Sequence, residues 1–256
     1  MPENLQALAK KHTTTKWSRI VRNLRSALFG DFIGTLGFIL LMAIILMSLI
    51  GPVWFPLDTV SDPTKLLMPP SSEHILGTDH LGRDVWAQIV SGGRELLLMS
   101  FLTAIIAVVL GITLGSLSAL VGGKFDEMLL FFADVWLTIP RFPLLVVLSG
   151  FFTLNATTLA FVLAILSWAG LYRTVRAEVL SLRNRDFVEA AFMLDMGKTH
   201  IIFKEVLPNM MGFVVANFTL LMRAAIYSQV GLVFLGLLPL DQNWGVMINV
   251  AWNQGV

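Results

Sequence analysis

Five long apolar stretches alternate with polar segments along the chain, and each approaches the length of a membrane-spanning helix. A hydrocarbon core about 30 Å thick requires about 20 apolar helical residues. Because backbone groups cannot stay unpaired in lipid, we expect helices in all five stretches. Pro140 and Pro143 interrupt the third stretch and predict a break in that helix. The expected spans are residues 32–50, 96–121, 128–152, 156–172 and 211–238.

The lysine and arginine residues are distributed unevenly between the polar segments. Six of them precede the first span and six lie between residues 173 and 204, whereas the segment 51–95 holds three, against six acidic residues. Since basic residues are retained on the cytoplasmic side, we expect residues 1–29 and the loop 173–210 in the cytoplasm, and residues 51–95 outside it. Five spans alternate correctly with this assignment.

The segment before the first span has an amphipathic pattern. Its apolar residues, among them Trp17 and Leu24, recur at helical spacing with arginines between them. We expect residues 1–29 to form a basic amphipathic helix on the inner leaflet, followed by the first transmembrane helix over residues 30–50. An ordinary basic anchor for that helix is the alternative, and both interpretations place the N-terminus in the cytoplasm.

The composition supports a membrane protein and excludes several other classes. Hydrophobic residues make up 56% of the 256 residues and charged residues only 14%, whereas about a quarter of a soluble domain is charged. We therefore expect an all-α polytopic protein in the lipid bilayer of a cell membrane. The chain has no cysteine, which excludes disulfides and cysteine-bound metals. The net charge of +1 gives no reason to expect binding to nucleic acid.

The sequence contains no motif for a nucleotide or a metal ion. A nucleotide-binding loop of the form GxxxxGK[ST] does not occur, so we expect that the chain itself does not hydrolyse ATP. His74 and His80 lie near Asp79 and Asp84 in the segment 51–95, but two histidines in a loop are more often incidental than metal ligands. We expect no metal site there.

The cytoplasmic loop predicts two short helices joined by a turn. Asp186 and Glu189 are spaced to cap the start of the first helix, and Gly197 ends or bends it. The second is expected over residues 201–207 and to stop ahead of Pro208. The residues that helical spacing places on one face of the first helix are Phe187, Ala191 and Leu194.

This stretch resembles the cytoplasmic EAA loop of ABC importer permeases. That loop has Glu-Ala-Ala, a glycine six residues after the glutamate and a closing Leu-Pro. Here Glu189 is the first residue of the Glu-Ala-Ala sequence and Pro208 is the last residue of the closing Leu-Pro. Asp195 occupies the glycine position, and the nearest glycine is Gly197. The resemblance implies a helix that docks in a groove of an ATPase subunit; the alternative is a surface helix in which Glu189 only caps. The expected coupling residues are Glu189, Ala190, Ala191, Leu194, Asp195, Gly197, Leu207 and Pro208.

Three further stretches resemble the oligopeptide/dipeptide/nickel permease family. GTDHLGRDVWAQIVSGGREL (77–96) is similar to the signature before the second span, GGKFDEMLLFFADVWLTIP (122–140) to the next block, and VFLGL (233–237) with Trp244-Gly245 to late elements. Gln229 stands where that family usually has glutamate. The resemblance covers about residues 22–247 and implies the C-type subunit, with the type I ABC importer transmembrane-domain fold. That fold has six spans, and we expect the permease core, residues 96–256, to lack the sixth.

The same resemblance implies the partners of the chain. These are a homologous second permease, two ATPase subunits that bind ATP and magnesium, and an extracytoplasmic solute-binding protein, in a bacterial or archaeal inner membrane. The segment that precedes the second span is then expected to face the binding protein. Its expected contact residues are Gly77, Thr78, Asp79, Gly82, Arg83 and Asp84.

Three ionisable residues fall inside apolar runs, where a charge costs several kcal/mol unless it is paired or hydrated. Asp134 and Arg141 are seven residues apart, about two helical turns, and Arg223 lies near the middle of the fifth span. We expect an internal Asp134–Arg141 ion pair and an Arg223 that faces a partner subunit. The alternative is that Arg141 or Arg223 lines the translocation path and meets polar or anionic groups of the substrate.

The resulting hypothesis is a permease subunit of an ATP-driven importer of oligopeptides or dipeptides. Oligosaccharides and nickel remain alternative substrates. A different class, a self-sufficient secondary transporter with an ion relay through Asp134 and Arg141, explains the charges but leaves the EAA-like loop unexplained. A membrane-bound enzyme is not expected, because the sequence shows no arrangement of nucleophile, base or metal ligands.

Overall fold

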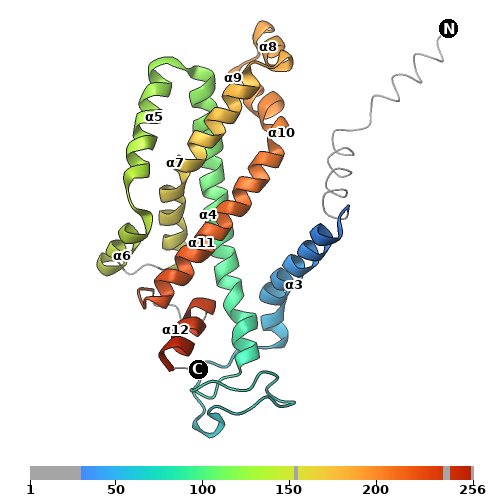
Figure 1. The fold of residues 1–256 in the computed structure, drawn as a ribbon, viewed down its shortest axis with the longest axis vertical. Coiled ribbons are helices and arrows are strands. Elements are labelled where there is room, and N and C mark those ends of the chain that lie inside the picture. The colour runs from blue at the N-terminus through green and yellow to red at the C-terminus, as the bar shows by residue number, and fades with distance from the viewer. Residues whose placement is uncertain (1–29, 153–154, 239–242, 255–256) are drawn as a thin grey trace, which may run out of the picture.

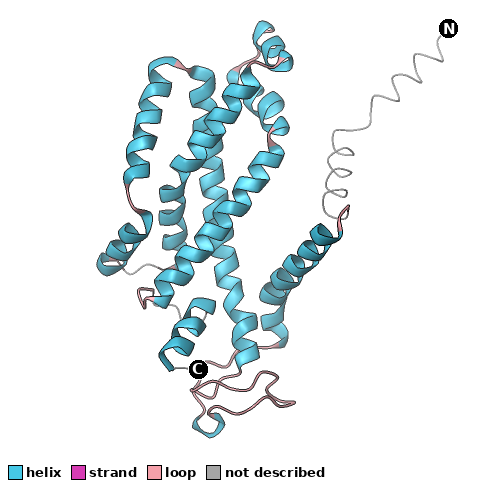
Figure 2. Cartoon of the chain, in the orientation of Figure 1, coloured by secondary structure: helices cyan, strands magenta, loops and turns pink. Residues whose placement is uncertain are grey.

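The computed structural model describes residues 30–152, 155–238 and 243–254 (Figure 1). The elements in these ranges are helices joined by loops (Figure 2). The predicted amphipathic helix over residues 1–29 lies outside the described residues. The prediction of an all-α fold is confirmed.

Four helices are long and apolar enough to cross a membrane: α3 (Phe32–Trp54), α4 (Val85–Val121), α7 (Ala156–Arg183) and α11 (Met211–Phe234). Helices α5 (Gly123–Thr138) and α6 (Arg141–Phe151) are bent by 74° relative to each other and give a fifth candidate if the pair is counted as one broken span. Four of the five predicted spans are therefore confirmed as candidate membrane helices, and the third is the bent pair.

The bend in the fifth of these spans arises at Pro140 and not at Pro143. Pro140 disfavours helical geometry in the residue before it, and Ile139 has an extended backbone with φ −73° and ψ 120°. Pro143 lies in the first turn of α6, where the missing N–H has no helical partner to lose. One proline thus breaks the helix and the other is tolerated inside it.

Several helices are longer than the apolar stretches that predict them. Helix α4 begins at Val85, eleven residues before residue 96, and its 37 residues extend about 55 Å. Helix α7 continues through Arg173 and Arg176 to Arg183, so these two arginines lie on a helix and not in the loop 173–210. Helix α3 ends at Trp54, which leaves residues 55–84 as the outer segment, with one 3-10 turn at Pro63–Lys65.

Helices α4 and α7 lie side by side in the middle of the bundle (Figure 1). Two glycines of α4 allow this approach. A Cβ at Gly111 would lie 2.6 Å from Leu171 Cγ, and one at Gly115 would lie 2.9 Å from the carbonyl oxygen of Tyr172. Small residues at helix interfaces allow close backbone approach in membranes, where helix association depends on van der Waals packing.

A polar cluster joins α4, α5 and α7 at one end of this pair. The Asp126 carboxylate forms a bidentate ion pair with Arg176, with both N–O distances 2.5 Å. Ser118 donates a hydrogen bond to Asp126, and its Oγ lies 2.7 Å from the Tyr172 hydroxyl. Because bidentate arginine–carboxylate pairs have a fixed geometry, this cluster sets the position of α5 against α7.

The other end of α4 is packed between α3 and α12 (Trp244–Gln254). A Cβ at Gly93 would lie 2.2 Å from Ser48 Oγ of α3 and 2.7 Å from Trp244 Cζ2 of α12. The Trp244 indole donates a 2.8 Å hydrogen bond to the carbonyl oxygen of Ile89. Helix α12 thus begins at the Trp244-Gly245 pair, where the family resemblance introduces its last helix. It has eleven residues, fewer than a membrane span requires.

We predict that Gly93→Ala lowers the free energy of unfolding by about 1–3 kcal/mol, because the added methyl overpacks the contact of α4 with Ser48 and Trp244. The measurement is the thermal unfolding midpoint of the detergent-solubilised subunit. Gly37→Ala in α3 is the matched control, since no atom lies within 4 Å of the added methyl there. Equal midpoints for the two variants would contradict the packing described.

Candidate functional site

The predicted coupling residues lie at one end of the bundle, where α7 ends and α11 begins (Figure 1). Helix α8 (Asp186–Met193) follows α7, and a second helical stretch follows a turn. That stretch consists of α9 (Lys198–His200), the π-helical segment η2 (Ile201–Val206) and α10 (Leu207–Asn209). We call residues 186–209 the tip. Two short helices with a turn between them were predicted here, and the structure contains them.

The second helical stretch differs from the prediction that it stops ahead of Pro208. It begins at Lys198 and passes through Pro208 to Asn209. In an α-helix the proline ring clashes with the carbonyl four residues earlier. The wider turns of the preceding π segment relieve that clash, so the helix can continue.

Helix α8 is fixed to the bundle by one buried face. Val188 and Ala191 are buried, with Ala191 only 4% exposed, and belong to a cluster that includes Val179 of α7 and Ile201 and Val206 of η2. Phe187 and Leu194, which helical spacing places on the face of Ala191, are exposed instead. Ala191 therefore packs inside its own chain.

The exposed surface of the tip combines large apolar side chains with charged ones, among them Asp186, Glu189, Asp195 and Lys198. Glu189 and Ala190 are exposed, and Leu194 is 70% exposed. The prediction that Asp186 caps α8 is wrong, because Arg185 holds the N-cap position and no side chain bonds the free amides there. The exposed large apolar residues of the tip are Phe187, Phe192, Met193, Leu194, Met196 and Phe203.

The turn after α8 is made at Asp195 and not at Gly197. Asp195 has a left-handed backbone with φ 51°. Its N–H donates to the carbonyl of Phe192 at 3.0 Å, and the Met196 N–H donates to that of Ala191 at 3.1 Å. These two bonds form a Schellman motif, which usually has glycine at the left-handed position. Asp195 occupies the position of the family glycine, so the backbone keeps the shape that the glycine favours.

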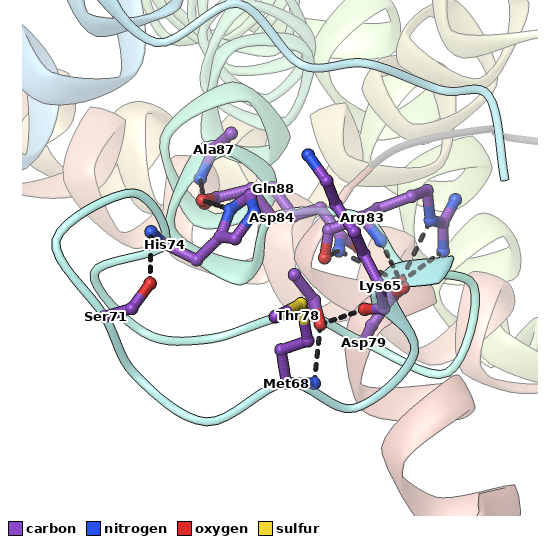
Figure 3. A network of polar contacts seen from close by, with 10 residues as sticks. All are labelled: Lys65, Met68, Ser71, His74, Thr78, Asp79, Arg83, Asp84, Ala87 and Gln88. Atoms are coloured by element: carbon purple, nitrogen blue, oxygen red, sulfur yellow. Dashed lines mark hydrogen bonds and ion pairs between the residues drawn. The ribbon is translucent and has the colours of Figure 1, made fainter. Parts of the chain in front are cut away.

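The outer signature residues lie in the loops before α4, as Figure 3 shows. Asp79 is the acceptor at their centre. Its Oδ1 accepts from the N–H groups of Leu81 at 2.8 Å and Arg83 at 2.9 Å. Its Oδ2 accepts from Arg83 Nε at 2.9 Å and from Gln88 Nε2 of α4 at 3.0 Å. Partial burial raises the pKa of Asp79, but these hydrogen bonds outweigh it and hold the pKa below its ordinary value.

Thr78 and Asp84 complete this network. Thr78 Oγ1 donates to the carbonyl oxygen of Lys65 and accepts from the Met68 N–H at 2.8 Å. Asp84 caps α4 by accepting from the Ala87 N–H at 2.8 Å, and its other oxygen lies 2.9 Å from His74 Nδ1. His74 thus pairs with a helix cap. Among the described residues no group of three or more histidine, aspartate or glutamate side chains is placed to hold a metal.

The two glycines of the signature allow the loop to fold back on itself. Gly77 and Gly82 have φ values of 76° and 78°. A Cβ at Gly82 would lie 2.2 Å from the carbonyl oxygen of Asp62, and one at Gly77 would lie 2.4 Å from that of Met68. All six signature residues are buried or half-buried. They hold the outer segment on α4 and leave its exposed surface to other residues.

The membrane charges do not form the predicted pair. Asp134 Oδ1 lies 3.2 Å from Arg173 Nη1 of α7, so the expected Asp134–Arg141 pair is wrong. The 74° bend turns α6 away from α5, and Arg141 instead has its Nη2 3.5 Å from the Cβ position of Gly170 on α7. Arg223 is exposed on α11 and makes no side-chain hydrogen bond or ion pair with any residue that the structure describes.

Two ion pairs that do form, Asp134–Arg173 and Asp126–Arg176, were not predicted from the sequence. Asp126 and Asp134 lie eight residues apart on α5, and Arg173 and Arg176 lie three apart on α7, so each pair of like charges recurs on one helical face. That spacing is the signal that could have found them.

Gln229 was also overlooked as a buried group: its side chain is fully buried, and neither amide atom has a hydrogen-bond partner among the described residues.

We predict that Asp195→Gly stabilises the end of α8 by about 1 kcal/mol, because glycine adopts the left-handed backbone without steric cost. Hydrogen exchange of the α8 amides in the membrane-embedded subunit measures this, and exchange should slow. Leu194→Gly is the control: Leu194 has φ −84°, where glycine only adds flexibility, so exchange should quicken. Faster exchange in both variants would rule out the strained turn.

We predict that Asp79→Asn loosens the outer segment by about 1–3 kcal/mol, because Arg83 loses its ionic partner. The readout is faster exchange of the Leu67 and Leu81 amides, which bond to Asp79. In the wild type this stabilisation is present at neutral pH and is lost only as the pH falls below the ordinary carboxyl value of 3.8. Glu73→Gln, at an exposed position, is the control. Unchanged exchange in Asp79→Asn would refute the network.

The chain is similar over nearly its whole length to known membrane transport proteins. Residues 107–255 match the family described as binding-protein-dependent transport system inner membrane component. A protein of Brucella suis described as a peptide permease is 34% identical over 93% of this chain and 78% of its own length. In Bacillus subtilis, the oligopeptide transport system permease is 30% identical (93% of this chain, 77% of its own), and the dipeptide permease 32% (93% and 73%). The chain is a multi-pass protein of the inner membrane and belongs to the family of binding-protein-dependent transport system inner membrane components.

Proposed function

We propose that the chain is the permease subunit of an ATP-driven importer that moves oligopeptides or dipeptides delivered by a solute-binding protein. The similarity to the two Bacillus subtilis permeases, which extends over 93% of this chain, supports the peptide substrate. The observation that carries the ATP-driven part of the proposal is the tip, where six large apolar side chains are exposed among charged ones at the end of the bundle and the helix beneath them is packed on the bundle.

The tip is suited to receive force from another protein. An exposed apolar surface of this kind marks a protein contact. The buried residues beneath it, Val188 and Ala191, pack on Val179 of α7 and Val206 of η2, and η2 leads through α10 into α11. A displacement of the tip is therefore transmitted to two membrane helices. We propose that an ATPase subunit binds this surface and carries it inward when ATP closes the ATPase dimer.

The remaining partners follow from this assignment. ATP and magnesium would bind to two ATPase partners, since this sequence has no GxxxxGK[ST] loop. A homologous second permease would complete the path, and the solute-binding protein would rest on the outer segment. The tip would lie in the cytoplasm and residues 55–84 outside it, in agreement with the distribution of basic residues. A secondary transporter with an Asp134–Arg141 relay loses support, because Asp134 contacts Arg173.

The test of the substrate is uptake into proteoliposomes that hold this chain with its second permease, ATPases and solute-binding protein. We expect ATP-dependent accumulation of labelled dipeptides or longer peptides. Maltooligosaccharides and Ni²⁺ serve as the competing substrates. Accumulation of either of these in place of peptides would replace the peptide assignment.

We predict that Leu194→Glu abolishes binding of the ATPase subunits and ATP-dependent uptake, because a carboxylate would be buried unpaired in the apolar contact. The loss should exceed about tenfold, and the subunit should keep its thermal stability, since Leu194 is 70% exposed. Val60→Glu is the control, an equally exposed apolar position (71%) in the outer segment. Normal uptake by Leu194→Glu would refute docking at the tip. Ala191→Trp would not test it, because Ala191 packs inside the chain.

A further inference from the structure

The face of α11 that points away from the bundle carries an unusual set of side chains for a membrane helix. Ala225, Gln229 and Leu232 define its buried face. The opposite face follows a spacing of four, three, four and four residues, which is one stripe of a helix. All of its members are exposed: Gly212, Ala216, Thr219, Arg223 and Tyr227.

Helix α3 provides a comparison for the exposed side of α11. It contacts the bundle on one side only, and its exposed residues are large and apolar, including Leu36, Leu40 and Ile44. No charged residue occurs in Phe32–Trp54. The stripe on α11 differs from this surface by the charge of Arg223 and the hydroxyl of Tyr227, both on exposed side chains. It therefore faces protein or water and not lipid.

Arg223 cannot escape the membrane core by extending its side chain. It is the thirteenth of 24 residues in α11, so about 17 Å of helix separates it from either end. Arginines near helix ends reach the interface by snorkelling, whereas charged residues within a span almost always face the bundle interior or a water-filled cavity. The guanidinium must therefore meet water, a carboxylate or both at the level of the membrane core.

The two aspartates of α5 already have arginine partners on α7. Asp134 pairs with Arg173 and Asp126 with Arg176, which leaves Arg223 without an acidic partner among the described residues. Tyr227, one turn further along, is 68% exposed and presents its hydroxyl on the same stripe. Gly212 and Ala216 lie two turns and more before Arg223, and their small size leaves space along the stripe on the N-terminal side of Arg223. Around Gly212 and Ala216 the stripe has the small residues typical of a helix–helix contact, whereas the Arg223 guanidinium and the Tyr227 hydroxyl require water or a polar partner.

We propose that Arg223 lines the translocation path and binds the C-terminal carboxylate of the passing peptide, with Tyr227 beside it. This inference rests on the proposed peptide import. The carboxylate is the one anionic group that all unmodified peptides share, whatever their sequence. A guanidinium pairs with it through two parallel hydrogen bonds, which gives an affinity that does not depend on peptide side chains. Arg223 would then determine specificity for free acids over neutral solutes.

The test uses the reconstituted complex and one labelled peptide in two forms, with a free C-terminal carboxylate and with a C-terminal amide. The peptide is chosen so that the purified solute-binding protein binds both forms, because selection by that protein would mask selection in the path. Wild type should carry the free acid faster than the amide. Arg223→Gln should reduce uptake of the acid about tenfold, leave that of the amide nearly unchanged and so abolish the preference. Arg223→Lys should retain part of it.

The controls distinguish a substrate contact from a structural role of Arg223. Leu220→Gln places the same amide side chain on α11 beside the stripe and should keep the acid preference. An unchanged preference in Arg223→Gln would overturn the proposal. Loss of the second permease from the purified Arg223→Gln complex would overturn it too, and would make Arg223 a contact between subunits. Absence of peptide uptake by the wild type would refute the proposed import itself and the carboxylate site with it.

Discussion

The close approach of α4 and α7 is the constraint on which the positions of the other helices depend. Gly111 and Gly115 allow the two backbones to pack closely, and Thr103 reinforces the contact by donating to the carbonyl oxygen of Ala160 at 3.2 Å. Where lipid gives no hydrophobic advantage to helix association, such packing is the main source of stability. The polar cluster around Asp126 then attaches α5 to this pair, and the cluster beneath α8 attaches the tip.

The charged side chains of the membrane helices occur in two settings, paired within the subunit or unpaired. Near the ends of α4, α5 and α7 they are paired within the subunit, as Asp126 is with Arg176, which neutralises them without help from a partner. Gln229 is an uncharged polar group at a fully buried position, where a carboxylate without a partner would cost more than an amide. Arg223 differs from these paired groups, because it is exposed and no described residue neutralises its charge.

The sequence was sufficient for the parts of the fold that depend on local composition. Apolar length located the spans, and the EAA-like spacing located α8 and its turn. Helix ends were less accurate, because α4 and α7 continue beyond the hydrocarbon core with polar residues that hydropathy does not separate from loops. The Asp134–Arg141 pair failed for a different reason. It required that the break at Pro140 rotate the helix only a little, and the direction taken after Pro140 depends on how α6 packs against Gly231 of α11 through Phe142. Contacts between distant segments determine the direction of such a helix, and the spacing of residues along one helix gives no information about those contacts.

The length of α4 has a mechanical consequence. One uninterrupted helix connects Asp84, which anchors the outer segment, to Ser118, which anchors the corner with α5. A rod of this kind has no internal hinge at which the two ends can move independently. In the proposed importer, docking of the solute-binding protein at one end and closure of the ATPase dimer at the other would therefore act on the same rigid helix, and each event would reach the far side of the membrane as a tilt of the whole of α4.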